Sequence, residues 1–192
     1  CRDRMKLLHI ITGLATGGAE RALCHLLAGG LAARHDCVVL SLSDEGSMGT
    51  DIRALGVPVE TLEMRAGLPE PGALIRLRRL VRAIRPDVIQ GWMYHGDLAS
   101  SLARALAPGR PALAWNIRHS LYDLGPEKPL TRQVIRVGRA LSGRPDAIIY
   151  NASLSRVQHE AFGFAAAPGI VIPNGFDVNR LRPNETVAAA VR

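Results

Sequence analysis

The chain is poor in aromatic side chains, in lysine and in long apolar runs. Aromatic residues make up 4% of its 192 residues, and Lys6 and Lys128 are its only lysines. Proteins that bind nucleic acid by base stacking place aromatic side chains among basic ones, and this sequence does not. No apolar run approaches the roughly 20 residues that a membrane-spanning helix requires. The composition therefore argues against nucleic acid as a partner and against a transmembrane segment.

Cysteine is also scarce. The three cysteines, Cys1, Cys24 and Cys37, have no metal-ligand spacing and cannot all pair. Cys24 and Cys37 fall in apolar segments, which predicts buried free thiols. The first residues lack the profile of a signal peptide, and Met5 fits a native start. These features predict a cytoplasmic protein.

Apolar runs alternate with amphipathic segments along the whole chain. An apolar content of 47% over 192 residues suits one globular core. Continuous apolar strands separated by helices predict a doubly wound, Rossmann-like α/β fold with a mostly parallel sheet and helices on both faces. The predicted strands cover 5–12, 36–43, 57–64, 86–92, 111–119, 145–152 and 169–177. The predicted helices cover 18–34, 49–55, 97–107 and 129–142, with one before Pro86 and one ending at Phe162.

Arginine supplies nearly all of the net charge of +7, and five arginines lie within residues 76–85. Apolar residues recur at helical spacing from Leu74 to Ile84, which predicts a helix with its arginines on the solvated face. A second interpretation is attraction of this helix to anionic lipid at a membrane surface.

The segment "GLATGGAE" follows the first predicted strand and leads into a helix. Its glycines are not spaced as in the dinucleotide motif G-x-G-x-x-G, and no Gly-Lys-Ser/Thr of a P-loop follows. Gly17 and Gly18 would let an anion approach the free N–H groups of the helix start. A tight turn that packs the helix closely on the sheet explains the glycines equally well.

The segment "GWMYHGD" places His95 and Asp97 just beyond the fourth predicted strand. In a doubly wound fold, ligands collect beyond the carboxyl ends of the strands. His95 should therefore face the same crevice as the glycine loop, and we assign it a function. Asp97 suits the N-cap of the following helix. Trp92 and Tyr94 are expected to line the crevice or to pack in the core.

The segment "NIRHS" ends the fifth predicted strand with Arg118 and His119. Arg118 can meet an anionic group or pair with an acid, and His119 again lies at a strand end. No acid or cysteine stands in a triad order with the histidines, and the spacing fits no metal site. The sequence therefore favours neither a hydrolase nor a metalloenzyme.

Two later segments are typical of a helix start and of a turn. In "YNASLS", Asn151 or Ser153 is expected to cap a helix. In "IPNGFD", Asn174 and Gly175 form a turn dipeptide between an apolar strand and a polar segment, which is typical of a domain junction.

Taken in order, "GLATGGAERAL", "YHGDLAS", "NIRHS" and "VIPNGFDVNRLRP" resemble the amino-terminal half of the retaining glycosyltransferases of family 4. The similarity runs from about Lys6 to Pro183. It implies one half of a GT-B fold, in which two Rossmann-like domains face each other across a cleft. It also implies transfer of a sugar from a nucleotide-diphosphate donor to a glycan or lipid-linked acceptor, with retention at the anomeric carbon.

The resemblance further implies a missing part. Residues 1–177 would form the acceptor-side domain, and 178–192 would begin the linker to a carboxyl-terminal domain that binds the nucleotide-sugar. That absent domain is the expected partner of this one, and the piece alone is expected to be inactive. No cofactor is expected, because the nucleotide-sugar is a substrate, and the resemblance implies that no metal is required.

Site residues follow from the resemblance position by position. Gly17 and Gly18 match the glycine loop near the donor phosphates and the acceptor. His95 matches the histidine close to the transferred sugar and is the catalytic candidate. Family members often have His-x-His just before this position, where this chain has Gln90 and Trp92.

Four more residues complete the candidate substrate-binding set. Asn174 and Gly175 match the family's interdomain turn, and Arg118 and His119 join them from the end of the fifth strand.

Two other classes of function remain open on the sequence. Asp44 and Glu45, after the second strand, are placed to meet a ribose in a dinucleotide-binding oxidoreductase. A non-catalytic sugar- or lipid-binding module is the other class. For the arginine helix, peripheral contact with the inner face of an anionic membrane is a further expectation.

Overall fold

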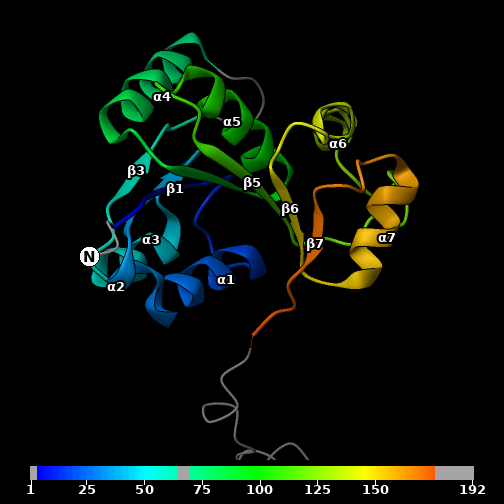
Figure 1. Ribbon diagram of the computed structural model, residues 1–192, viewed down its shortest axis with the longest axis horizontal. Coiled ribbons are helices and arrows are strands. Elements are labelled where there is room, and N and C mark those ends of the chain that lie inside the picture. Colours follow the sequence, from blue (N-terminus) through cyan, green and yellow to red (C-terminus); the bar gives the residue numbers. More distant parts are fainter. Residues whose placement is uncertain (1–3, 65–69, 176–192) are drawn as a thin grey trace, which may run out of the picture.

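A seven-stranded parallel sheet forms the centre of the molecule, as the computed structural model shows for residues 4–64 and 70–175 (Figure 1). Neighbouring strands follow the order β3-β2-β1-β4-β5-β6-β7 and all pair in parallel. This confirms the predicted doubly wound α/β fold. The strands are β1 (Lys6–Ile11), β2 (Asp36–Ser41), β3 (Val59–Thr61), β4 (Val88–Trp92), β5 (Ala112–Ile117), β6 (Ala147–Tyr150) and β7 (Gly169–Val171).

Helical segments connect the strands. The predicted helix over 18–34 has a five-residue π-helical segment at its centre, where Gly30 has a φ of 106°. Only glycine adopts that conformation readily, so the backbone bends there before entering β2. The helical elements are α1 (Gly18–Leu26), η1 (Leu27–Leu31), α2 (Ala32–Arg34), α3 (Gly46–Ala54), α4 (Pro71–Ile84), α5 (Met93–Leu106), α6 (Pro129–Leu141) and α7 (Ser153–Phe162).

Two helical layers cover the two faces of the sheet (Figure 1). On one face, α4, α5 and α6 pack against a core that includes Leu8, Ile89 and Trp115. On the other face, α1 and α3 pack against a core that includes Ile11 and Val39. Successive strand residues point to opposite faces, so a strand covered on both sides is apolar throughout.

The second face is covered less completely than the first. Ile170 of β7 is 43% exposed, and Ile172, just beyond that strand, is 51% exposed. An apolar groove of about 230 Å³ lies on the same face, lined in part by Leu26, Ala114 and Ile149. This groove lies along the sheet and away from the carboxyl ends of the strands.

The strand order reverses at β1. From β1 the chain goes to β2 and β3 on one side, and it then returns to place β4 on the other side of β1. The segments that follow β1 and β4 therefore separate at the carboxyl edge of the sheet, where doubly wound folds bind their ligands.

Several local predictions need correction. The helix predicted over 97–107 begins four residues earlier, at Met93, so Asp97 is not its N-cap. No side chain caps α7, whose N-cap is Ala152, so the assignment of Asn151 or Ser153 as its cap was wrong. Cys37 is buried as expected, whereas Cys24 is partly exposed, and both thiols are free.

The arginine helix confirms its predicted pattern with one change. Ala73, Leu77 and Val81 form the buried stripe of α4, and Leu74, predicted to share it, is 44% exposed. The exposed positions of α4 include Arg78 and Arg82. Within the described ranges, no helix is long and apolar enough to cross a membrane. The predicted linker, 178–192, and the end of the predicted domain at 177 lie outside the described residues.

Candidate functional site

The glycine loop after β1 ends at the start of α1. Gly17 is the N-cap of α1, has an extended backbone, and no side chain caps the helix. Among the described residues, no side-chain hydrogen bond to the first N–H groups of α1 is seen, which leaves them available to a ligand or water. The carboxylate of Glu20, in the first turn of α1, lies beside Gly17 and would have to move for an anion to bind there. A Cβ at Gly18 would meet nothing within 4 Å, so packing within the described chain does not require glycine there. Neither residue has a left-handed backbone, so the backbone conformation itself does not require glycine at these two positions.

The first residues of α3 contact the glycine loop. Met48 N–H donates to the carbonyl oxygen of Leu14 at 2.9 Å. The hydroxyls of Thr16 and Ser47 lie 3.0 Å apart. Gly46, with a φ of 53°, lets the two backbones meet, since a Cβ there would lie 2.3 Å from the oxygen of Leu14.

The start of α5 lies directly against the central strand. A Cβ at Gly96 would lie 2.5 Å from the carbonyl oxygen of Ile10 in β1, so only glycine fits. Gly91 of β4 is likewise required, because its Cβ would lie 2.6 Å from the Cα of Asp97. Met93, the first residue of α5, has a φ of 62°, which costs a non-glycine residue energy and persists only where the surroundings hold it.

His95 occupies the first turn of α5, at the carboxyl edge beside the point where the strand order reverses. Its side chain is half-buried, and burial lowers its pKa below the usual value of 6.5. The imidazole is therefore neutral at pH 7 and offers one donor and one acceptor nitrogen. Such a group can orient a hydroxyl without adding positive charge.

Asp97 is buried within α5 and not at its end. Its Oδ1 accepts a hydrogen bond of 3.1 Å from the backbone N–H of Asn116 in β5. Its Oδ2 and the Oδ1 of Asn116 are both buried without a partner among the described residues. Burial raises the pKa of Asp97 well above 3.8. Asp97 thus joins α5 to β5 below the site.

Arg118 lies just beyond β5 and carries a charge without an acidic partner. Its guanidinium carbon lies 5.7 Å from the centre of the Trp92 ring. Its Nη2 donates a hydrogen bond to Oδ1 of Asn174. No ion pair to it exists within 4–64 and 70–175. Burial lowers the pKa of its guanidinium from the ordinary value, which still leaves it charged at pH 7. The acid pairing considered for Arg118 is therefore not seen in the described part of the chain.

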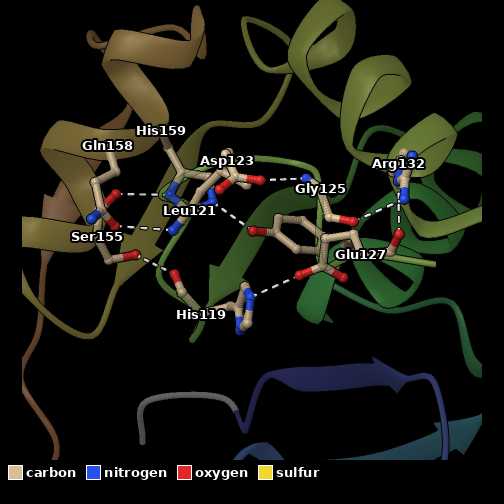
Figure 2. Close-up of polar contacts among 10 residues, drawn as sticks. His119, Leu121, Asp123, Gly125, Glu127, Arg132, Ser155, Gln158 and His159 are labelled. Carbon is tan, nitrogen blue, oxygen red and sulfur yellow. Dashed lines mark hydrogen bonds and ion pairs between the residues drawn. The ribbon is translucent and has the colours of Figure 1, made fainter. Parts of the chain in front are cut away.

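The structure thus joins two of the predicted site residues directly, Arg118 and Asn174. Gly175 follows Asn174 as the last described residue, and a Cβ there would meet nothing within 4 Å. His119 is held differently: its Nε2 lies 3.0 Å from Oε1 of Glu127, in the segment before α6 (Figure 2). The His119 side chain is therefore held by a contact within the segment between β5 and α6.

A group of residues behind this edge had no functional role predicted from the sequence. The Tyr94 hydroxyl lies 2.8 Å from Nε2 of His159, a fully buried residue of α7. Tyr94 was expected to line the crevice or to pack in the core, and no role was predicted for His159. The residues that flank His159 in α7, Gln158 and Glu160, are polar, so the local sequence gave no signal of its burial. Its partner is 65 positions away.

No three His, Cys, Asp or Glu side chains of the described residues gather closely enough to hold a metal ion. The expectation that no metal is needed remains a prediction.

The family model described as Glycosyltransferase Family 4 matches residues 16–180. The chain therefore belongs to glycosyltransferase family 4, and it contains a glycosyltransferase domain. No curated protein sequence matches it.

Solved structures share the fold. Anabaena Alr3699/HepE, in complex with UDP and glucose, matches with a TM-score of 0.76 and 23% identity over 98% of this chain and 50% of that one. The lipopolysaccharide outer core galactosyltransferase WaaB, in its apo form, matches with a TM-score of 0.68 and 14% identity over 91% of this chain and 47% of that one. UDP-N-acetylglucosamine 2-epimerase from Rickettsia bellii matches with a TM-score of 0.57 and 14% identity over 90% and 45%.

The chain spans about half the length of these structures. Its Rossmann-like sheet corresponds to one half of a GT-B glycosyltransferase, consistent with an amino-terminal domain.

Proposed function

We propose that this domain is the acceptor side of a retaining glycosyltransferase that transfers a sugar from a nucleotide-diphosphate donor to a glycan or lipid-linked acceptor. The observation that carries the proposal is the carboxyl edge of the sheet, where the start of α1, the neutral His95 and Arg118 lie on neighbouring connections. Arg118 has no acidic partner among the described residues. HepE, which has the same fold, was solved with UDP-glucose. This supports a nucleotide-sugar donor here.

Anion binding is the first task of this edge. The free N–H groups at Gly17 and Gly18 and the positive end of the α1 dipole favour negative charge. Arg118 adds a full charge on a planar fork that matches phosphate geometry. When the bond from the anomeric carbon to the diphosphate oxygen breaks, these groups stabilise the charge on the leaving diphosphate.

His95 acts on the sugar. A neutral imidazole can accept a hydrogen bond from one hydroxyl or donate one to another without opposing the positive charge that develops at the anomeric carbon. In a retaining transfer, the acceptor oxygen bonds to the same face of that carbon from which the diphosphate leaves. His95 orients the ring on that face.

We further propose that residues 1–177 need a second, donor-binding domain and transfer no sugar alone. One basic group and two glycines supply too few contacts to hold a nucleotide-sugar in a fixed position. Asn174 and Gly175 would connect the two domains, and the bond from Arg118 to Asn174 fixes the beginning of that connection. The donor needs no metal in this proposal, and no cofactor takes part.

The oxidoreductase alternative is weaker. Glu45 is one of the two acids expected to meet a ribose. Its Oε1 accepts a hydrogen bond from Nε of Arg53 at 2.6 Å, and its Oε2 accepts one from Nη2 of the same residue at 3.1 Å. Its carboxylate is therefore occupied. The match to family 4 also favours sugar transfer.

Membrane contact is a separate part of the proposal. On the three fully described helices α4, α5 and α6, Asp97 is the only acidic residue, and it is buried. Exposed Arg78 and Arg82 lie near Ile75, which is 63% exposed. Helices with positive charge, no exposed acid of their own and scattered apolar side chains suit the surface of an anionic membrane. We propose that the protein binds there peripherally, on the cytoplasmic side, where a lipid-linked acceptor would be reached.

The test uses the full-length polypeptide. Incubation with UDP-sugars and with glycan or lipid-linked acceptors should release UDP and form a product whose anomeric configuration, read by NMR, matches that of the donor. The variant H95A is the control for the site. Absence of UDP release, together with calorimetric binding of a nicotinamide cofactor at physiological salt, would replace the proposal with the oxidoreductase alternative.

A further inference from the structure

Helix α7 contacts both chain segments that carry the candidate site. Ser155 Oγ donates to the carbonyl oxygen of His119 at 2.7 Å, directly after Arg118 (Figure 2). The N–H of Leu121 donates to Oε1 of Gln158 at 2.9 Å. These bonds hold the backbone that follows β5.

The third contact, between His159 and Tyr94, reaches α5, and its direction can be derived. His159 Nδ1 lies 2.7 Å from the carbonyl oxygen of Ser155, which can only accept, so Nδ1 carries the proton. Burial lowers the pKa of His159, so the ring is neutral and its Nε2 is an acceptor. Tyr94 therefore donates its hydroxyl proton to Nε2 across 2.8 Å.

His159 cannot easily move from this position. Its ring is fully buried, with the centre of the Phe164 ring at 5.1 Å and that of Tyr150 at 5.5 Å. Tyr94 is equally confined, because it is buried and precedes Gly96, which packs on β1. A hydrogen bond between two confined side chains fixes the segments that carry them.

The segment fixed on the α5 side is strained. Met93 precedes Tyr94 and has a left-handed backbone, a conformation that costs on the order of 1 kcal/mol or more unless the surroundings maintain it. The bond from Tyr94 to His159 lies immediately after this residue. Its loss would let the first turn of α5, which carries His95, relax.

We propose that His159 is a positioning residue: through Tyr94 it fixes His95, while Ser155 and Gln158 on the same helix fix the chain after Arg118. Helix α7 thereby sets the distance between the group that orients the sugar and the group that binds the diphosphate. The catalytic consequence of this role rests on the proposed glycosyl transfer.

The experiment compares three variants of the full-length polypeptide. Y94F removes one hydroxyl and H159F removes the acceptor, and both keep an aromatic ring in place. S142A is the matched control: Ser142 is buried, accepts from Ala165 N–H at 2.8 Å, and follows α6 at the opposite edge of the sheet. Y94F loses one buried hydrogen bond, whereas H159F and S142A each lose two. S142A is therefore expected to lose at least as much stability as Y94F and about as much as H159F.

Y94F and H159F should each lower kcat about tenfold with little change in KM, and the double variant should lower it no further than the single ones. The NMR titration of the His95 imidazole should shift in both. S142A should change neither. Equal loss of kcat in S142A, or an unchanged kcat and His95 titration in Y94F and H159F, would overturn the positioning role.

Hydrogen exchange separates this inference from the proposed function. Amides of the first turn of α5, and that of Leu121, should exchange faster in Y94F and H159F than in S142A, whether or not the polypeptide transfers sugar. A wild-type polypeptide without transferase activity would refute the proposed function alone. Unchanged exchange would refute the role of His159 alone.

Discussion

The guanidinium carbon of Arg118 lies 5.7 Å from the centre of the Trp92 ring, so a positive charge rests on an aromatic face at the carboxyl edge of the sheet. Trp92 ends β4 and Arg118 follows β5, its neighbour in the sheet. The stacking orients the guanidinium without neutralising it, because a π-face attracts a cation but carries no net charge. The guanidinium of Arg118 is therefore oriented by Trp92 and keeps its positive charge, which an anion can bind.

Replacing Arg118 should weaken donor binding more than it weakens the fold. We expect R118A to raise KM for the nucleotide-sugar by roughly 10- to 100-fold in the full-length enzyme, since a charge-assisted, two-pronged contact is lost. R118K keeps the charge but loses the planar fork and should fall between wild type and R118A. Equal KM values for R118A and wild type at low salt would contradict the assignment.

Replacing His95 should lower turnover without unfolding the domain. We expect H95A to reduce kcat by about 10²-fold, in the range of a lost positioned polar group. Its unfolding midpoint in urea should stay close to that of wild type, because His95 is only half-buried. A kcat equal to that of wild type would remove His95 from the site.

The pH profile tests the same residue. Burial lowers the pKa of His95, so the neutral form persists below the usual value of 6.5. Wild-type kcat/KM should remain level as pH falls through about 6.5 and decline only at lower pH. The decline attributable to His95 should be missing from H95A. A decline that begins above 6.5 and depends on His95 would show that the imidazole is not shielded.

Asp97 offers a stabilising substitution. Burial raises its pKa, so the folded chain keeps a proton that the unfolded chain releases, and the free energy of unfolding falls as pH rises above 3.8. We expect D97N to be more stable than wild type at about pH 8, by on the order of 1–3 kcal/mol, since its amide is never charged. D97A, which leaves the N–H of Asn116 without its acceptor, should be less stable. Urea unfolding of D97N below wild type at that pH would contradict this.

His9 should account for part of the acid sensitivity of the fold. It is buried in β1, and burial lowers its pKa to about 4. The unfolded chain therefore takes up a proton near pH 6.5 and the folded chain does not. The resulting loss in unfolding free energy between about pH 6.5 and 4 is on the order of 3 kcal/mol.

The variant H9Q isolates this contribution. It cannot take up the proton, so its stability should fall less than that of wild type over the same interval, as measured by urea unfolding at several pH values. The difference between the two chains cancels the opposite trend from Asp97. Parallel pH curves for H9Q and wild type would contradict the burial argument.

Charge reversal on α4 tests the membrane contact. R78E/R82E should reduce co-sedimentation of the full-length polypeptide with phosphatidylglycerol vesicles at least about tenfold at low salt, since each basic residue near the surface contributes about 1 kcal/mol. R21E/R34E makes the same charge change on the opposite layer and should have a smaller effect. Equal losses in the two variants, or no binding by wild type, would remove the membrane from the proposal.

The sequence predicted most of the elements because each has a local signature. Apolar runs predicted all seven strands, and the arginine helix predicted from the spacing between Leu74 and Ile84 lies within α4. The start of α5 was predicted four residues too late. The chain enters this helix through Met93, whose left-handed backbone has no recognisable sequence pattern. The prediction that Asp97 caps a helix failed for the same reason.

By itself, the sequence determined the alternation of strand and helix, the glycine loop at Gly17 and Gly18, and the family. Those properties depend on neighbours along the chain. Only the tertiary structure decided that Arg118 stacks on Trp92, that Asp97 is buried against β5, and that Tyr94 donates to His159. Each of these contacts joins residues 19 to 65 positions apart or lies across two strands, so no local periodicity encodes it. The packing of α5 and α7 around the sheet brings them together.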